Sequence, residues 1–172
     1  MSKYGCPACP LNKADVRTPK MQPTIADETL VYFLAEAPGR DEDEVSGKPL
    51  TGPSGKLLRE CIPTDLIDFC SFDNCVRDRP PNNRPPEQVE IEACRGYVVS
   101  SIEKAKPKLI VGLGAVALRW ALGSSDIGGY RGRFFTIKVG SHSCYFLCTY
   151  HPSFVLRTAH NKSKPLNSKF GH

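Results

Sequence analysis

The sequence predicts an α/β fold with a largely parallel β-sheet that helices cover on one or both faces. Short apolar runs typical of buried strands alternate with helical segments along most of the 172 residues. Several of these runs lead directly into loops rich in glycine or proline, the usual position of functional sites in such sheets. We find no internal repeat, and the length indicates a single domain spanning residues 1–172.

The strands are predicted from runs rich in β-branched, aromatic and other apolar residues. The expected strands are 31–35, 69–76, 109–113, 134–139 and 144–149, the last two joined by a Gly-Ser-His-Ser turn.

The helices are predicted from apolar residues at helical spacing and from end signals. Helices are expected at 56–61, at 87–104, at 115–122 before Gly123, and directly after His151. Residues 1–29 are polar and proline-rich and are expected to be irregular, as is 79–86, where four prolines remove donors and fix φ. The tail 159–172 is polar, and we expect it to be loose.

The composition narrows the class of protein only broadly. The net charge of +5 permits a phosphate-rich partner without demanding one. No apolar run approaches the roughly 20 residues that span a membrane, and the N-terminus lacks the pattern of a signal peptide. We therefore expect no membrane association and a cytoplasmic location, in a bacterial or archaeal cell or an infected host.

Two glycine-rich patches suggest ligand sites. Gly112-Leu-Gly114 follows a predicted strand, but the rest of a dinucleotide fingerprint is absent, so close packing of strand and helix explains it better. The loop 47–55 places glycines, Thr51 and Ser54 just before a helix, where free backbone N–H groups favour an anion. It lacks the ending of an ATP-binding loop, and an ordinary helix cap at Ser54 is the alternative.

A second loop carries an imidazole. His151 follows a strand and precedes a helix containing Ser153 and Arg157, so it can donate a hydrogen bond to an anion. A lone histidine is more often a satisfied structural group. The acidic loop after 31–35 and this loop both follow parallel strands, so we expect Glu36 and His151 to meet at one edge of the sheet.

Eight cysteines are many for a cytosolic chain, where disulfides are rare and metal binding is common. Four of the cysteines fall in predicted strands or at helix ends, and we expect them to be buried packing residues: Cys61, Cys70, Cys144 and Cys148. The remaining four, Cys6, Cys9, Cys75 and Cys94, form a long-range set that suits either zinc or a [4Fe–4S] cluster. A redox role for Cys6-x-x-Cys9 lacks the strand-to-helix context it needs.

These motifs together resemble the family four, iron–sulfur uracil-DNA glycosylases. The resemblance covers Cys6 to Arg157 and rests on the following segments: Glu36-Ala-Pro-Gly39, Glu42-Asp43, Gly47-x-Pro, Gly52-x-x-Gly55-x-Leu-Leu58, Asn74, Arg79-Pro-Pro81, Asn83-Arg84, Val111-x-Leu-Gly114-x-x-Ala117, Arg131-Gly132 and His151-Pro-Ser-x-x-Leu-Arg157. The Gly-Pro-Ser-Gly form also resembles glycosylase-type domains of bacteriophages, some linked to phage DNA polymerases. The resemblance implies a three-layer sandwich around a central, mostly parallel four-stranded sheet.

The resemblance implies removal of uracil from DNA by base flipping. Glu36 and Ala37 would line the uracil pocket and order the attacking water, with help from Asn83. Asn74 would recognise the edge of uracil and reject cytosine. His151 would hydrogen-bond O2 and stabilise the uracil anion as the glycosidic bond breaks.

The resemblance also implies contacts to DNA outside the base pocket. Ser54, Arg84 and Ser153 would bind phosphates, which gives affinity without sequence preference. Leu156 or Arg157 would enter the base stack when the nucleotide flips out.

Two positions depart from the family pattern. Leu50 stands where the family usually has an aromatic residue that stacks on uracil, an interaction worth about 1–3 kcal/mol. Asp78 stands where the third cluster cysteine precedes Arg-Pro-Pro. Cys75 can substitute through a shifted loop, Asp78 can ligate iron, or the cluster can be absent. The hypothesis favoured here is a cluster on Cys6, Cys9 and Cys94 with Cys75 as fourth ligand.

Two other functions stay open from the sequence alone. One is a non-catalytic DNA-binding or replication accessory protein that keeps the glycosylase fold, and the other is a zinc-stapled nucleotide-binding protein. For the favoured function the expected partner is DNA, with a DNA polymerase or replication protein as a further candidate. We expect a monomer.

Overall fold

A computed structural model describes residues 5–163 of the chain. The N-terminal segment contains a short 3₁₀ helix, η1 (Pro10–Lys13), and an isolated bridge between Thr24 and Phe72. The remaining residues between 5 and 29 are irregular, as predicted.

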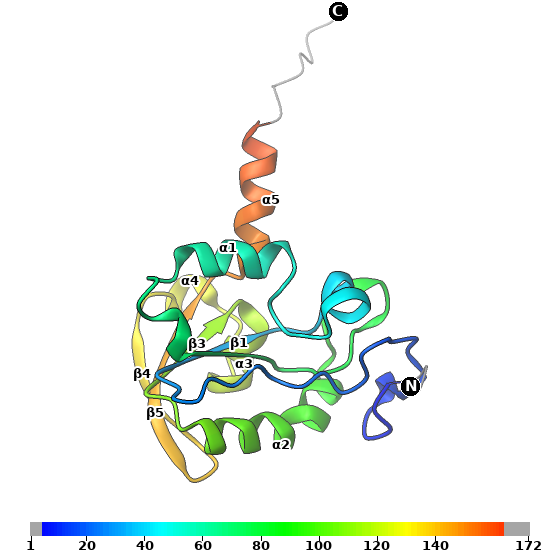
Figure 1. The fold of residues 1–172 in the computed structure, drawn as a ribbon, viewed down its shortest axis with the longest axis horizontal. Helices are drawn as coiled ribbons and strands as arrows, with labels where there is room; N and C mark the ends of the chain where they lie inside the picture. Colours follow the sequence, from blue (N-terminus) through cyan, green and yellow to red (C-terminus); the bar gives the residue numbers. More distant parts are fainter. Residues whose placement is uncertain (1–4, 164–172) are drawn as a thin grey trace, which may run out of the picture.

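The centre of the molecule is a five-stranded sheet in the order β2-β1-β3-β5-β4 (Figure 1). Its strands are β1 (Val31–Ala35), β2 (Cys70–Asn74), β3 (Leu109–Leu113), β4 (Phe134–Val139) and β5 (His142–Thr149). β1, β2, β3 and β5 run parallel, and β4 pairs antiparallel with β5 as an edge strand. The mostly parallel α/β fold is confirmed, with one strand more than the four expected.

Helices cover both faces of the sheet and make the predicted three layers (Figure 1). The helices are α1 (Pro53–Cys61), α2 (Gln88–Ala105), α3 (Ala115–Leu122), α4 (Ile127–Tyr130) and α5 (Pro152–Ser163), with 3₁₀ turns η3 (Ile67–Phe69) and η4 (Pro81–Asn83). Residues 159–163 were expected to be loose but continue α5, and residues 164–172 lie outside the described residues.

The alternation of side chains along β1 divides the core in two. Tyr32 and Leu34 belong to the cluster that includes residues of α2 and α3. Phe33 belongs to a second cluster, where it stacks on Phe72 of β2 and which Leu58 of α1 joins. Both faces of the strand are therefore buried, which explains its continuous apolar sequence.

The helix ends follow the local sequence. α2 begins with a capping box. The side chain of Glu87 accepts the backbone N–H of Glu90, and the side chain of Glu90 accepts the backbone N–H of Glu87. α3 ends at Gly123, whose φ of 73° is the left-handed conformation that glycine adopts without strain. Within residues 5–163, no helix has the length and apolar character needed to cross a membrane.

Three of the four cysteines expected to be packing residues, Cys70, Cys144 and Cys148, are buried. Cys61 is exposed, and that prediction was wrong. It is the last residue of α1, on a helix whose inward face is supplied by other residues such as Leu58.

Gly55 allows the loop before α1 to turn back over the helix. A Cβ atom on Gly55 would lie 1.8 Å from the carbonyl oxygen of Leu50, whose own φ is +54°. We expect Gly55→Ala to lower the free energy of unfolding by about 1–3 kcal/mol, the usual cost of overpacking. Urea unfolding followed by circular dichroism measures this.

Gly96→Ala is the matched control. Gly96 lies inside α2 with no atom within 4 Å of an added Cβ. The substitution should raise stability by about 0.5–1 kcal/mol, because alanine loses less backbone entropy in a helix. Equal stability of the two variants would contradict the steric role of Gly55.

Candidate active site

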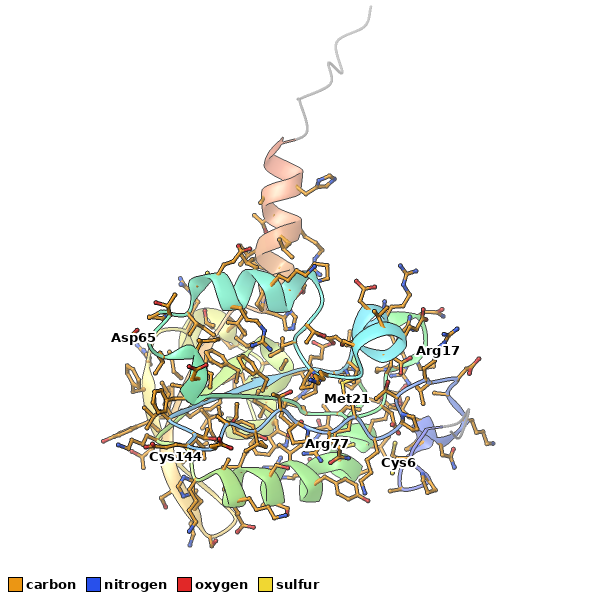
Figure 2. The ribbon with its side chains drawn as sticks, viewed as in Figure 1. Cys6, Arg17, Met21, Asp65, Arg77 and Cys144 are labelled. Carbon is orange, nitrogen blue, oxygen red and sulfur yellow. The ribbon has the colours of Figure 1, made fainter. Side chains whose placement is uncertain are left out.

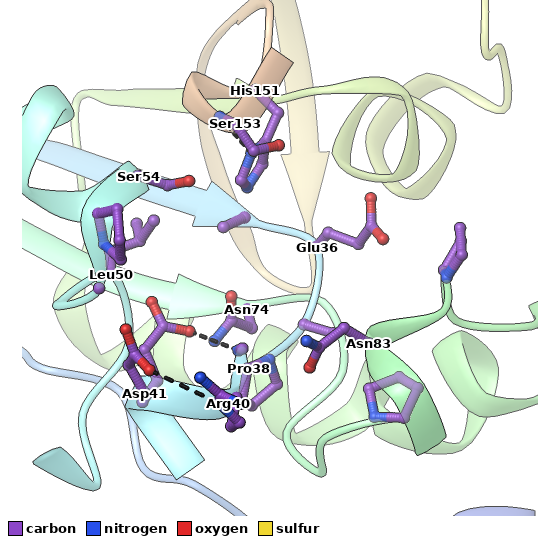
Figure 3. A pocket seen from close by; sticks show the side chains of 18 of the residues that line it. Glu36, Pro38, Arg40, Asp41, Leu50, Ser54, Asn74, Asn83, His151 and Ser153 are labelled. Carbon is purple, nitrogen blue, oxygen red and sulfur yellow. Dashed lines mark hydrogen bonds and ion pairs between the residues drawn. The ribbon is translucent and has the colours of Figure 1, made fainter. Parts of the chain in front are cut away.

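A pocket of about 630 Å³ opens at the carboxyl edge of the parallel strands (Figure 3). It is lined by residues that follow β1, β2 and β5, by the start of α1 and by the loop around η4. The lining includes these predicted site residues: Glu36, Ala37, Leu50, Ser54, Asn74, Asn83, Arg84, His151, Ser153 and Arg157. Segments more than 100 residues apart therefore meet in one cavity, as the parallel topology predicts.

Glu42 organises the loop after β1. Its side chain is 8% exposed, and Oε2 accepts a hydrogen bond of 2.7 Å from the backbone N–H of Gly39. Burial raises its pKa, while the backbone N–H groups of Gly39 and residues 50–52 act in the opposite direction. One carboxylate thus ties two parts of the pocket wall together. The segment Glu42–Ser46 forms a π-helical turn (η2) that the sequence did not predict.

The N-terminus of α1 opens on the pocket. Gly52 is the N-cap, Pro53 occupies the first turn, and Ser54 follows, all three among the lining residues. Free backbone N–H groups and the helix dipole favour an anion at such a position. The loop predicted as a phosphate cradle therefore ends at a helix N-terminus on the pocket, but the Glu42 carboxylate already interacts with the backbone N–H groups of residues 50–52. Leu50 lies beside this helix end and is 2% exposed.

Asn74 ends β2 opposite Ala35 of β1, and its side chain lines the pocket. It is 2% exposed. The backbone hydrogen bonds between the two chain segments continue beyond β2. The N–H of Cys75 donates to the carbonyl oxygen of Ala35, and the N–H of Val76 donates to that of Glu36. This extension fixes the backbone of Glu36 beside the residues that follow β2. Cys75 faces away from the pocket into the core, as strand alternation predicts.

His151 is held as a neutral donor. Its Nδ1 accepts a hydrogen bond of 3.1 Å from the backbone N–H of Ser153, which caps the first turn of α5. A neutral ring whose Nδ1 accepts carries its proton on Nε2. Ser153 Oγ lies 2.9 Å from the same nitrogen and accepts from Arg157 Nη1 at 3.2 Å. The Nε2–H is therefore the group that His151 can offer to a ligand.

The pKa of His151 falls to about 4, first because of burial and second because of the nearby Arg157. The imidazole thus stays neutral at ordinary pH. The unfolded chain, with an ordinary histidine pKa near 6.5, binds a proton as the pH falls through that value while the folded chain does not. This group therefore lowers stability as the pH falls from about 6.5 towards 4.

Gly114 makes room for His151. It caps α3 with a φ of +89°, and its N–H donates to Thr149 at the end of β5. A Cβ atom here would lie 3.1 Å from the Cβ of His151. Both glycines thus serve close packing, as expected, but with different partners. Gly114 packs on the histidine loop, whereas a Cβ on Gly112, inside β3, would lie 2.6 Å from Phe146 of β5 and 3.4 Å from Ala117 of α3.

Glu36 lines the same pocket as this histidine, and burial raises its pKa. Arg119 and Arg157 act in the opposite direction. Arg119, on α3, was not predicted as a site residue because nothing in its local sequence distinguishes it from a surface arginine. Arg40 also lines the pocket and follows directly on the Glu36–Gly39 motif, a signal that could have identified it.

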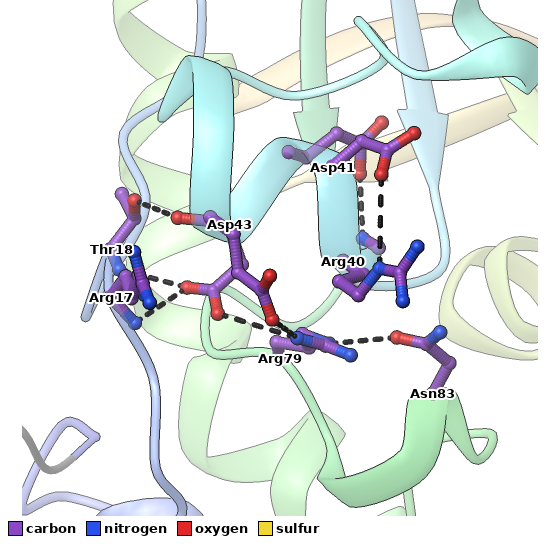
Figure 4. A network of polar contacts seen from close by, with 10 residues as sticks. Arg17, Thr18, Arg40, Asp41, Asp43, Arg79 and Asn83 are labelled. Carbon is purple, nitrogen blue, oxygen red and sulfur yellow. Dashed lines mark hydrogen bonds and ion pairs between the residues drawn. The ribbon is translucent and has the colours of Figure 1, made fainter.

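Asn83 is held by a polar network shown in Figure 4. Its Oδ1 accepts a hydrogen bond of 2.7 Å from Arg79 Nε, so its amide N–H groups remain for the pocket. Arg79 also pairs with Glu44 at 2.8 Å and lies 3.7 Å from the buried Asp43. Asp43 Oδ1 in turn accepts the backbone N–H groups of residues 17 and 18. The network joins the N-terminal segment to two sides of the pocket.

The residues predicted to contact DNA differ in how far their side chains are free to do so. Arg84 lines the pocket, but both ends of its guanidinium bind Glu90, at 2.6 and 2.9 Å. Its charge is therefore largely matched within the protein. Leu156 lies outside the pocket on α5 and is 38% exposed, together with Phe154 and Val155 at 46% each.

Cys6, Cys9 and Cys94 form a group that we call the cysteine group. It lies away from α5, near the start of α2, where Figure 2 shows Cys6. Cys9 interacts electrostatically with Cys6 and Asp78, and Cys94 interacts with all three of these residues. Burial raises the pKa of Cys94 to about 11, while the backbone N–H of Arg77 beside its sulfur acts in the opposite direction. Backbone N–H groups next to sulfur are typical of thiolate ligands.

The donors near the start of α2 are compatible with an iron–sulfur cluster. Within residues 5–163, no three histidine, cysteine or acidic side chains converge on a point that would hold a single metal ion. A cluster spreads its protein ligands around a larger inorganic core, so grouped but separated thiols are compatible with it. Three cysteines and a buried carboxylate are present.

Comparison with known proteins identifies the family. The model of the uracil DNA glycosylase superfamily matches residues 22–170. The chain belongs to this superfamily. Curated relatives carry the name type-4 uracil-DNA glycosylase, which agrees with the resemblance found in the sequence.

Three of these relatives show how far the similarity extends. The protein of Archaeoglobus fulgidus is 32% identical, over 88% of this chain and 78% of its own length. That of Pyrobaculum aerophilum is 34% identical, over 89% and 80%. That of Saccharolobus solfataricus is 36% identical, over 73% of this chain and 62% of its own length, so the chain spans less than two thirds of that relative.

The electrostatic coupling of His151 to Arg157 can be measured. We expect Arg157→Ala to raise the pKa of His151 from about 4, because one of its two causes is removed while burial remains. Nitrogen-15 and proton NMR of the imidazole across pH 3–8 measures the titration. Lys138→Ala, on the exposed edge strand β4, is the control and should leave the pKa unchanged. An unshifted value in Arg157→Ala would contradict the coupling.

Proposed function

We propose that this protein hydrolyses the N-glycosidic bond of uracil in DNA after flipping the nucleotide out of the stack. The observation that carries the proposal is the meeting of Asn74 and His151 in one pocket beside the N-terminus of α1. One group can read a base edge, one can stabilise a leaving anion, and the helix end can bind a phosphate. Membership of the uracil DNA glycosylase superfamily supports the same activity.

Asn74 would provide base selection. Its amide can donate to O4 of uracil and accept from N3–H, a pattern that cytosine, with an amino group at C4 and no proton on N3, does not match. The side chain is almost fully buried at a strand end, which limits its conformational freedom before the base arrives. A mismatched base would leave buried polar groups without partners, which costs about 1–3 kcal/mol per group.

His151 would stabilise the leaving group. As the glycosidic bond breaks, negative charge develops on the uracil ring, and the Nε2–H deduced above can donate to O2. A neutral histidine stabilises the anion by a hydrogen bond and does not transfer its proton. The low pKa of His151, which keeps the ring neutral, suits this role.

Glu36 and Asn83 would place the attacking water. Glu36 can accept a hydrogen bond from the water, and the two nearby arginines favour its charged form. Asn83 has its N–H groups free to donate, because its Oδ1 is oriented towards Arg79. The proposed role of Asn83 is therefore to donate to the water oxygen rather than to remove its proton. Arg79 acts as a positioning residue for Asn83.

DNA would be held around the pocket. Ser54 and Ser153 would contact phosphates, and Leu156 or Arg157 on α5 would fill the gap left by the flipped nucleotide. Arg84 can assist only through N–H groups that Glu90 does not occupy. The net charge of +5 favours such contacts.

Leu50 would contact the base by its aliphatic side chain where the family has a ring. It is anchored among Phe33, Phe72 and Leu113 and lines the pocket. A non-catalytic or weakly catalytic DNA-binding accessory protein is the second candidate function, because the lost stacking would weaken binding of the base. Cytoplasmic location, monomeric state, phage origin and association with a polymerase stay predictions from the sequence.

We also propose that Cys6, Cys9 and Cys94 hold a [4Fe–4S] cluster. From the sequence, Cys75 was the favoured fourth ligand. When bound, the cluster would supply a rigid link between the N-terminal segment and α2, with no part in breaking the glycosidic bond.

Loss of the His151 donor tests catalysis directly. Wild-type protein should release uracil from a uracil-containing oligonucleotide, so that alkali then cuts the strand. We expect His151→Ala to lower the single-turnover rate by about 10²–10³-fold, the usual effect of removing one such donor. DNA affinity, measured by fluorescence anisotropy, should change little. Lys138→Ala is the control and should keep the wild-type rate.

DNA binding by the wild type without strand cutting would favour the accessory function. Uracil release that His151→Ala leaves unchanged would instead remove the histidine from the mechanism.

The positioning role of Arg79 makes a separate prediction. Arg79→Ala frees Asn83, and we expect the single-turnover rate to fall about 10- to 100-fold with unchanged affinity for DNA, because misplacement of a water-holding group has that scale of effect. Arg17→Ala is the matched control, since only the backbone N–H of Arg17 joins the network. Equal rates in the two variants would contradict the role.

A further inference from the structure

Asp78 lies within the cysteine group rather than at its margin. It is 1% exposed, and it interacts electrostatically with both Cys9 and Cys94. One of its carboxylate oxygens accepts the backbone N–H of Cys6. Every one of the three grouped cysteines therefore has Asp78 as a neighbour.

The carboxylate is also held in a fixed orientation. Its second oxygen accepts the backbone N–H of Lys20, in a later part of the N-terminal segment than Cys6. These two hydrogen bonds hold both carboxylate oxygens in place and oppose rotation of the carboxylate. Ligating carboxylates in metal sites are commonly oriented by hydrogen bonds of this kind.

Cys75 has a different environment. It is fully buried at 0% exposure, with Glu36, Asp73 and Arg95 among its electrostatic neighbours, besides Cys94. Its N–H donates to Ala35, which keeps it in register with the end of β1. Moving its sulfur towards Cys6 would break this pairing and displace Asn74 from the pocket. The shifted loop that would bring Cys75 into the ligand set therefore has a structural cost at the active site.

We propose that Asp78, rather than Cys75, is the fourth protein ligand of a [4Fe–4S] cluster held by Cys6, Cys9 and Cys94. The inference rests on the cluster proposed above, and it names the residue of this chain that completes the site. Protein ligands other than cysteine can hold iron in a cluster, as histidines do in Rieske centres. Cys75 is then a core packing residue.

A carboxylate ligand from Asp78 makes one iron of the cluster chemically different from the three irons bound by cysteine. Carboxylate is a harder ligand than thiolate and binds cluster iron less tightly. The iron on Asp78 is therefore the first to leave. With ferricyanide as oxidant, [4Fe–4S]²⁺ releases one Fe²⁺ and gives one electron to ferricyanide, which becomes ferrocyanide, and [3Fe–4S]⁺ remains on the three cysteines.

The test compares full-length wild type with Asp78→Cys, Asp78→Ala and Cys75→Ser, each purified without oxygen and reconstituted with ferrous iron and sulfide. Iron, acid-labile sulfide and absorbance near 400 nm are measured before and after EDTA, and electron paramagnetic resonance after one equivalent of ferricyanide. Circular dichroism and urea unfolding check that each variant is folded.

We expect wild type and Cys75→Ser to hold equal iron and to show the same [3Fe–4S]⁺ signal after ferricyanide. Asp78→Cys should keep its fourth iron, lack that signal and lose absorbance in EDTA about 10-fold more slowly, the scale on which ligand-shell changes alter metal affinity. Asp78→Ala should hold the three-iron form from the start.

Three results would overturn the proposal. They are loss of the cluster in folded Cys75→Ser, identical iron loss in wild type and Asp78→Cys, and wild type that binds no iron on reconstitution. Uracil release from the same preparations is measured separately. A wild type that holds iron as expected but releases no uracil would sink the glycosylase proposal and leave the ligand assignment standing.

Discussion

The parallel pairing of β1 with both β2 and β3 is the constraint on which the rest of the structure depends. It aligns the carboxyl ends of the strands, so that the segments after Ala35, Asn74, Leu113 and Thr149 leave the sheet at one edge. Backbone hydrogen bonds fix this register to a single residue, since a slip by one would turn Asn74 into the core and Cys75 into the pocket. The placement of Asn74 in the pocket and of Cys75 in the core are thus two consequences of one register.

Burial at that edge sets the chemistry available there. It moves the pKa of His151 down and the pKa of Glu36 up, because desolvation disfavours the charged form of each. Arg157 lowers both values, which keeps the histidine neutral and favours the ionised carboxylate. One arginine on α5 thus supports the two protonation states that the proposed reaction needs.

Much of the fold and of the pocket could be predicted from the sequence. Strand and helix periodicities identified the main elements, and the loops after β1 and β5 could be expected to meet because parallel strands share an edge. The π-helical turn at Glu42–Ser46 and the extension of α5 to Ser163 could not, since both depend on tertiary contacts or on continuation of a polar helix. The pairing of Arg84 with Glu90 was equally hidden, because it joins a proline-rich loop to a helix cap.

Asp78 shows where sequence reasoning lacks the decisive information. Spacing alone gives Cys75 and Asp78 equal access to the cysteine group, because three residues of loop can shift either into place. The structure separates them through contacts that involve neither metal nor spacing: Cys75 is held by the strand ladder beside Ala35, and Asp78 by the amides of Cys6 and Lys20. A substitution that replaces a thiol with a carboxylate therefore changes the ligand without disturbing the register that the pocket requires. Leu50 is a substitution of the other kind, because it lies on the pocket wall itself and alters what the base would contact.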